Sequence, residues 1–346
     1  MKGALLVNLG SPKSTQLEDI KSYLDEFLMD ERVIDYPYWL RNLVVRGIIL
    51  KTRPPKTQAN YKRIWDNGSP LIVYTENLCH KVSQNVAFPI EMAMRYGEPS
   101  LKNGLRNLSD KGVNEVLIIP LFPQFAMATI ESATARIDEL AKEYFPSIKT
   151  TVLPPFYNQP EYIEVMAKNI KRQLKEIEYD HLLFSYHGVP ERHIRKSDIT
   201  NGHCKMDGQC CQTPSEAHKY CYRHQCLETT RLITQKLNLK KETYSHSFQS
   251  RLGLIPWLKP YTAKHIPDLA KNGIEKLAIV SPAFVADCIE TIDELGREAK
   301  ELFIENGGKE FHLISCLNDR QDWANVLSKW MDEWAGKKPE KTEIKL

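Results

Sequence analysis

The sequence lacks a hydrophobic run long enough to cross a membrane as a helix, although 42% of its 346 residues are hydrophobic. Residues 43–50 form one apolar stretch, but Arg46 and Gly47 interrupt it. Residues 4–7 are apolar but too few for the core of a secretory signal peptide, and no cleavage site follows them. We therefore expect a cytoplasmic protein.

A strong excess of charge of one sign is also lacking. The chain carries 47 Lys and Arg against 44 Asp and Glu, a formal net charge of +3. No long basic run occurs, so the charge gives no indication of a nucleic-acid partner. The G-x-G-x-x-G motif does not follow the first expected strand of either half of the chain, so dinucleotide binding is not supported.

Cysteine is present and unevenly distributed, because five of the eight cysteines lie within residues 204–226. Cytosolic thiols stay reduced, so a disulfide framework is not expected. The segment reads Cys204-x5-Cys210-Cys211-x9-Cys221-x4-Cys226. This spacing fits neither ferredoxin pattern and by itself favours zinc slightly over iron–sulfur. His203, His218 and His224 add possible zinc ligands.

Short apolar runs alternate with helical patterns along the chain, which predicts buried parallel strands in an α/β fold. The expected strands are residues 4–9, 90–95, 116–121, 181–186, 243–248, 277–280 and 311–314. Residues 161–177 and 323–334 have the periodicity of amphipathic helices.

The two halves of the sequence resemble each other. Residues 112–132 align with 273–291, and residues 4–12 align with 182–190, in the same order. We therefore expect two similar lobes, residues 1–160 and 161–346. At aligned positions His187 replaces Leu9, and Asp287 and Cys288 replace Ala128 and Thr129, so the second lobe is chemically specialised.

Carboxylates follow the strand at 277–280. If a helix begins near Val285, then Asp287, Glu290 and Glu294 share one face. Such a face is often simply exposed to solvent, and a histidine such as His187 is often only structural. An acidic line opposite a histidine can also pass a divalent metal ion or carry protons away from a base.

Aromatic and apolar residues gather in two further segments, residues 35–56 and 248–260, the second of which contains Trp257. Both compositions are common in packed cores. If the two segments are functional, they indicate a binding cleft for a flat hydrophobic ligand. They also indicate a lip at the entrance of this cleft that touches a membrane surface.

Taken together, these residues resemble the ferrochelatase family, whose members insert ferrous iron into a porphyrin in haem synthesis. The similar motifs are "LLVNLGSP", "RPPKTQANYKRIWDNGSPL", "AMRYGEPS", "PLFPQF", "LLFSYHGVPER", "SFQSRLGLIPWLKP" and "SPAFVADCIETIDELG". The resemblance implies a class II chelatase-like α/β fold: two similar Rossmann-like lobes, each a four-stranded parallel sheet flanked by helices. The lip would lie in the first lobe at about 35–56.

The resemblance also implies roles for individual residues. The family's active-site histidine falls on His187 and its metal-site glutamate on Glu290, so both are candidate ligands of the substrate Fe²⁺. Asp287 and Glu294 continue an acidic path. The implied porphyrin contacts are Leu9, Arg53, Tyr61, Ser69, Arg95, Tyr96 and Trp257.

Some bacterial members of the family hold a [2Fe–2S] cluster in an internal segment, which here corresponds to about residues 200–226. By that resemblance the expected ligands are Cys204, Cys211, Cys221 and Cys226. Zinc is the alternative. Adjacent Cys210 and Cys211 are not both expected to bind.

Several functions are compared. The first is a ferrochelatase, a lyase, with protoporphyrin IX favoured over coproporphyrin as substrate. The rivals are a chelatase for a corrin precursor and a porphyrin- or haem-binding carrier or sensor. A carrier needs no line of carboxylates facing His187, and a corrin precursor suits an apolar lip poorly.

Overall fold

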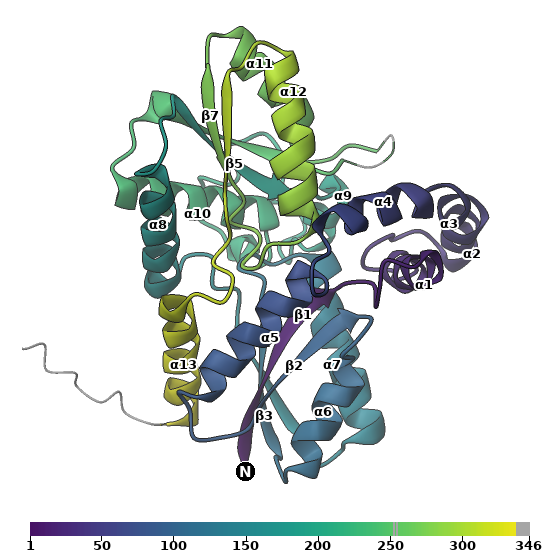
Figure 1. Ribbon diagram of the computed structural model, residues 1–346. Helices are drawn as coiled ribbons and strands as arrows, with labels where there is room; N and C mark the ends of the chain where they lie inside the picture. The colour runs from purple at the N-terminus through teal and green to yellow at the C-terminus, as the bar shows by residue number, and fades with distance from the viewer. Residues whose placement is uncertain (252, 254, 337–346) are drawn as a thin grey trace, which may run out of the picture.

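The computed structural model describes residues 1–251, 253 and 255–336, and within them two parallel sheets of four strands each (Figure 1). Residues 252 and 254 of the 248–260 segment thus lie outside the described residues. The first sheet has the order β2-β1-β3-β4 and the second has the equivalent order β6-β5-β7-β8. The strands are β1 (Lys2–Gly10), β2 (Ile90–Tyr96), β3 (Glu115–Pro120), β4 (Lys149–Val152), β5 (His181–His187), β6 (Tyr244–Gln249), β7 (Lys276–Val280) and β8 (Glu310–Ile314). The predicted α/β architecture of two similar sheets is confirmed.

All seven predicted strands are present, and the sequence missed only one of the described strands, β4. Its residues Lys-Thr-Thr-Val form a short strand at the edge of the first sheet and are largely exposed. An exposed edge strand needs no apolar run, so its sequence gives little signal. By contrast, Ala4, Leu5, Leu6 and Val7 of central β1 are fully buried, as expected for a strand covered on both faces.

Helices cover both faces of each sheet. In the first lobe, α6 (Leu101–Asp110) and α7 (Ser132–Tyr144) pack on the face that contains Leu5 and Val7. Helix α5 (Pro70–Ser83) packs on the opposite face, against Leu6. In the second lobe, α11 (Thr262–Lys271) and α12 (Ala299–Glu305) cover one face.

The inner faces of the two lobes share one hydrophobic core. Leu6 of β1 and Leu182 of β5 belong to the same cluster of buried residues, together with α8 (Pro160–Leu174) and α10 (Tyr222–Leu237). Helix α13 (Gln321–Ala335) follows the second sheet but returns to pack against α5 (Figure 1). It contributes Trp323 and Trp330 to this core, so the lobes are packed together along their length.

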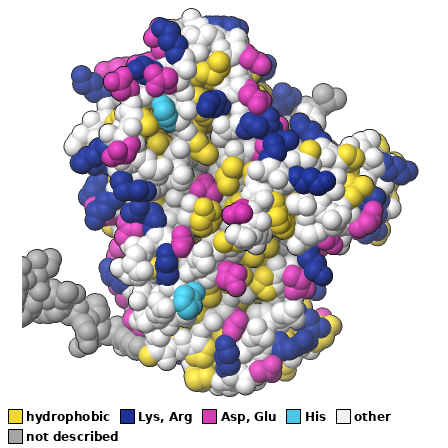
Figure 2. All heavy atoms as spheres, in the orientation of Figure 1, with side chains coloured by type: hydrophobic (Ala, Val, Ile, Leu, Met, Phe, Trp, Pro, Cys, Tyr) yellow, Lys and Arg dark blue, Asp and Glu magenta, His cyan; other side chains and the backbone are white. Residues whose placement is uncertain are grey.

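The chain between β1 and α5 forms a helical projection at one side of the first lobe (Figure 1). It consists of α1 (Leu17–Leu28), α2 (Tyr38–Asn42), the π-helix η1 (Leu43–Ile49), α3 (Leu50–Thr52) and α4 (Pro54–Ile64). The predicted lip, residues 35–56, forms most of its outer part. On the face shown in Figure 2, hydrophobic side chains reach the surface on this projection and between the lobes.

Ion pairs tie this projection to the second lobe at two places, between α1 and α2 and at the end of α4. Asp35 pairs with Arg192 and Lys196 of α9 (Glu191–Lys196). At the second place, Arg63 of α4 donates through Nε and Nη2 to the two oxygens of Asp293, at 2.8 and 3.0 Å. Because charged Asp293 is almost fully buried, these bonds are stronger than a surface ion pair. The projection is therefore held over the second lobe.

The remaining short helices are η2 (Met127–Glu131), η3 (Glu216–Lys219), η4 (Lys241–Thr243) and η5 (Glu290–Glu298). None of the helices in the described residues is long and apolar enough to cross a membrane.

Candidate active site

His187 is the last residue of β5, at the carboxyl end of the second sheet, where ligands of parallel α/β folds bind. Its Nδ1 lies 2.7 Å from the backbone oxygen of Gly188. A carbonyl oxygen can only accept a hydrogen bond, so Nδ1 carries the proton of the neutral ring. The Nε2 atom therefore keeps a lone pair that can accept another proton.

The surroundings of His187 favour this neutral form. Burial lowers the pKa of His187 below its usual value, and the charge of Glu290 only partly opposes that shift. The positive charge of Arg53 lowers this pKa further. The imidazole is therefore unprotonated near neutral pH, as a general base must be.

Glu290 and Glu294 lie on η5, a π-helix that follows the loop after β7. The prediction of a helix from Val285 was wrong, because the helix begins at Glu290. Hydrogen bonds with Asn318 hold the preceding segment as a loop: the Asn318 N–H donates to Val285 O, and Asp287 N–H donates to Asn318 Oδ1. π-Helical turns are rare and often mark functional sites.

Asp287 is thus not on a helical face with the two glutamates. Its carboxylate accepts hydrogen bonds from Thr291 Oγ1 at 2.9 Å and Asn318 Nδ2 at 2.7 Å, and from the backbone N–H of Cys316. The Asp287 carboxylate thus has hydrogen-bond donors on both of its oxygens. Through its bonds to Cys316 and Asn318 it joins the loop before η5 to the loop after β8. The structure gives Asp287 the position of an anchor rather than of a third member of an acidic path.

Glu290 and Glu294 are both partly buried. Burial raises the pKa of Glu290, and the nearby charge of Glu294 raises it further. Burial also raises the pKa of Glu294, although a 2.6 Å hydrogen bond from Ser250 Oγ to Glu294 Oε2 opposes this shift. Two neighbouring buried carboxyl groups do not ionise together easily, so the pair can hold and exchange a proton.

Apolar side chains surround this group. Leu9 is partly buried and contacts three clusters, which contain Tyr61, Cys288 and Phe125 respectively. Trp257 is buried, and among the described residues its Nε1 has no hydrogen-bond partner. The structure therefore places Leu9 and Tyr61 of the predicted porphyrin contacts in one apolar cluster, and Trp257 beside Gly188, the residue after His187.

The sequence analysis missed several members of this wall. Phe122, Phe125 and Ile130 form one cluster against Leu9, and the Phe284 ring lies 6.4 Å from that of His187. The Pro-Leu-Phe-Pro-Gln-Phe motif at the end of β3 was noticed as a family motif, but its two phenylalanines were not identified as site residues.

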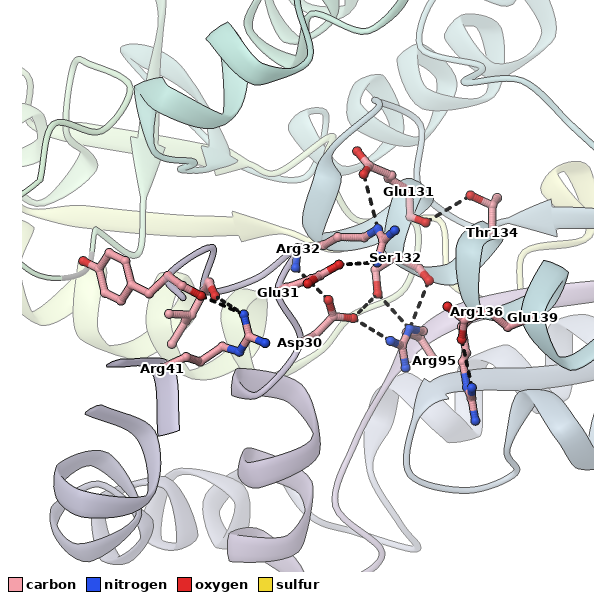
Figure 3. A network of polar contacts seen from close by, with 12 residues as sticks. Asp30, Glu31, Arg32, Arg41, Arg95, Glu131, Ser132, Thr134, Arg136 and Glu139 are labelled. Carbon is pink, nitrogen blue, oxygen red and sulfur yellow. Dashed lines mark hydrogen bonds and ion pairs between the residues drawn. The ribbon is translucent and has the colours of Figure 1, made fainter. Parts of the chain in front are cut away.

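The other predicted porphyrin contacts lie in different surroundings. Arg95 belongs to the polar network of Figure 3: Arg95 Nη2 donates to Asp30 Oδ2 at 2.5 Å, and Arg95 Nε donates to Ser132 Oγ at 2.7 Å. The hydroxyl of fully buried Tyr96 also donates to Asp30. Ser69 is buried at the start of α5, whereas Arg53 is exposed and acts on His187 through its charge.

The five cysteines of residues 204–226 are all buried and carry free thiols. The Cys221 thiol lies near those of Cys204 and Cys211. Its interaction with the Cys204 thiol, together with burial, raises the pKa of Cys221 to about 12, and burial raises the pKa of Cys226. In the described part of the chain, no three His, Cys, Asp or Glu side chains form a group placed to hold a metal ion.

The three histidines near these thiols have other partners. His203 Nε2 lies 2.7 Å from the Cys210 backbone oxygen, and His224 Nδ1 lies 2.9 Å from the Cys211 backbone oxygen. His218 stacks on His224 with ring centroids 3.6 Å apart. These contacts shape the segment and direct the imidazoles towards its backbone.

The chain is similar to known ferrochelatases over most of its length. A family model described as Ferrochelatase matches residues 1–334. The ferrochelatase of Ectopseudomonas mendocina (strain ymp) is 44% identical over 326 residues, which cover 93% of this chain and 95% of that protein. The ferrochelatase of Pseudomonas entomophila (strain L48) is 45% identical over 327 residues, 94% of this chain and 96% of that protein.

Among solved structures, SirB from Bacillus subtilis with Fe3+ superposes with a TM-score of 0.54. The sequences are 13% identical, and the match covers 96% of this chain and 94% of SirB. This likeness supports a shared chelatase-like fold.

Proposed function

This chain belongs to the ferrochelatase family, enzymes that insert ferrous iron into a porphyrin in haem synthesis, and we propose that His187 and Glu290 carry out this insertion. The observation that carries the proposal is the partly buried, neutral imidazole, whose Nε2 is free to accept a proton beside a carboxyl pair. A carrier or sensor would not need that pair.

His187 is the proton acceptor in this proposal. Two pyrrole N–H bonds of the porphyrin break as Fe²⁺ forms bonds to the four ring nitrogens and loses its water ligands. Nε2 of His187 takes the pyrrole protons one at a time, because the ring is neutral before each transfer. A positioned base of this kind contributes about 10²–10⁴ to the rate.

Glu290 and Glu294 receive each proton from His187 and release it to solvent, so that the base is neutral again before the second transfer. Once His187 is protonated, its positive charge stabilises an ionised Glu290, and the proton can pass to the carboxyl pair. Glu290 and His187 also offer oxygen and nitrogen donors that suit an arriving Fe²⁺. Asp287 holds the loop that positions η5 and takes no proton in this scheme.

The porphyrin lies against the apolar wall. We assign Leu9, Tyr61 and Trp257 to contacts with the ring and exposed Arg53 to one of its carboxylate side chains. We assign a supporting role, without ring contact, to Arg95, Tyr96 and Ser69. The polar groups of Arg95 and Tyr96 are already hydrogen-bonded, and Ser69 is buried. Protoporphyrin IX fits this mainly apolar environment better than coproporphyrin, which carries more carboxylates.

Replacing His187 by Ala should lower kcat for metal insertion by at least about 100-fold and leave porphyrin binding within about tenfold, because the apolar wall dominates binding. Glu290→Gln should lower kcat strongly, and Glu294→Gln less. Insertion of Fe²⁺ under anaerobic conditions, followed by the visible spectrum, measures these rates.

The matched control is Asp287→Asn, which changes a carboxylate of the same segment. It should lower the free energy of unfolding by about 1–3 kcal/mol, because its new amide opposes that of Asn318, and retain more kcat than Glu290→Gln. Near-normal turnover in His187→Ala would contradict the proposed base.

We also propose that the cysteine-rich segment holds a [2Fe–2S] cluster through Cys204, Cys211, Cys221 and Cys226. Its support is the set of buried thiols around Cys221 and the guanidinium of Arg223, which lies 3.4 Å from Cys211 Sγ and can balance thiolate charge. The engagement of the histidines with backbone oxygens favours cysteine over histidine ligands. Such a cluster supplies one-electron chemistry and folding energy when bound.

Gently purified protein should contain about two iron atoms and two acid-labile sulfides per chain. Serine at Cys204, Cys221 or Cys226 should remove both and lower the melting temperature, since ligand binding energy is also folding energy. Cys210→Ser is the matched control and should retain the cluster. Stoichiometric zinc without sulfide would overturn the assignment.

The helical projection is proposed to touch a membrane surface transiently. Tyr38, Trp39, Leu43 and Ile48 are 57–68% exposed, an unusual concentration of large apolar side chains. Arg46 and Lys51 lie among them and can meet anionic headgroups.

Protein incubated with anionic vesicles should co-sediment, and Trp39→Ser should reduce the bound fraction several-fold because it removes the most exposed aromatic ring of the projection. Tyr144→Ser, on α7 outside the projection, is the control and should bind like the unchanged protein. Equal binding by all three proteins would exclude a membrane role for the projection.

A further inference from the structure

The hydroxyl of Tyr222 donates a 2.9 Å hydrogen bond to the backbone oxygen of His187. Tyr222 is the first residue of α10, and it lies near the end of the cysteine-rich segment, residues 204–226. Its side chain is buried, and neither the sequence motifs nor the roles proposed above use it. A side chain 35 residues away thus contacts the backbone of the proposed base.

The His187 carbonyl needs such a partner because of its direction. In a trans peptide, the carbonyl of one residue and the N–H of the next point to opposite sides. The Gly188 N–H donates to Gln249 O of β6 at 2.8 Å, so the His187 carbonyl points away from β6. On that side, the pairing of β5 with β7 ends at Phe184 and Val280. Tyr222 therefore takes the place of a strand partner.

These contacts hold the His187–Gly188 peptide at both ends. The carbonyl is held by Tyr222 and the N–H by Gln249, while Gly188 O accepts the hydrogen bond from Nδ1 of His187. No side chain fits at residue 188, because a Cβ there would lie 2.6 Å from Gln249 O and 3.2 Å from Trp257 Cε3. The orientation of the imidazole thus depends on a peptide plane that Tyr222 helps to fix.

We propose that Tyr222 is a positioning residue that orients His187 for proton transfer, an inference that rests on the proposed role of His187 as base. The Tyr222 side chain also lies near the Cys226 thiol, within the cysteine-rich segment. One residue therefore connects the cysteine-rich segment with the reacting imidazole. A misdirected base loses rate even when the substrate still binds.

The neighbouring residue Gln225 shows that this turn of α10 is built against the site. Its Oε1 accepts a 2.7 Å hydrogen bond from the Phe125 N–H, and its Nε2 donates to the backbone oxygens of His218 and Lys219. The first turn of α10 thus supports both the apolar wall and the base.

Tyr222→Phe tests the inference, because it removes the hydroxyl and keeps the ring. We expect kcat to fall about three- to tenfold, the effect of one hydrogen bond, with the KM for porphyrin unchanged within about twofold. Kinetics with Zn²⁺ or Fe²⁺ as the metal, together with melting temperatures, provide both values.

Tyr186→Phe is the matched control. Tyr186 is also buried, and its hydroxyl lies 2.7 Å from Thr230 Oγ1 of the same helix, but no hydrogen bond joins it to the His187 carbonyl in the described residues. This variant should lose comparable stability and keep its kcat. Equal kcat losses in both variants, or none in Tyr222→Phe, would overturn the positioning role while leaving His187 as base.

His187→Ala, measured in parallel, separates this failure from that of the proposed function. If His187→Ala turned over normally, both the base and its positioning residue would be excluded.

Discussion

The burial of one imidazole beside two carboxyl groups is the constraint on which the rest of the site depends. Isolated charges are costly in such a place, so His187 is held neutral and Glu290 and Glu294 have raised pKa values. A proton that passes from His187 to Glu290 or Glu294 therefore leaves the total charge of these three groups unchanged. This property suits a reaction that releases two protons from an apolar ring.

The duplicated fold provides the position for these groups. The carboxyl end of β5 presents His187, and the segment after β7, the next strand in the same sheet, presents Glu290. The first lobe contributes apolar residues such as Leu9, at the equivalent end of β1. Ion pairs at Asp35 and Arg63 hold the helical projection over the second lobe. One lobe thus carries the ionisable groups, and the other carries much of the apolar surface.

The fold and the central histidine were predictable from the sequence because they depend on local patterns. Buried strands read as apolar runs, and His187 stands at a strand end where its counterpart in the first half is Leu9. The line of carboxylates was predicted in the wrong register, because the loop before η5 is set by Asn318, which lies in a distant part of the chain.

Other features also depended on contacts between distant segments. A π-helical turn has no simple periodic signature, so η5 was expected as an ordinary helix from Val285. The hydrogen bonds of Arg95 with Asp30 and of Tyr222 with His187 join residues separated by 65 and 35 positions. Sequence spacing does not show such pairs, and only the packed structure brings them together.

The pH dependence of kcat tests the central claim most directly, measured anaerobically with both substrates saturating. Catalysis requires unprotonated His187, so kcat falls as the pH drops through the pKa of His187. Because burial lowers that pKa, full activity should persist below about pH 6.5, the usual histidine value. In Glu290→Gln the midpoint of the residual activity should move to still lower pH, since the charge that raises the pKa of His187 is gone. A midpoint at or above about 6.5 that Glu290→Gln leaves in place would contradict the account.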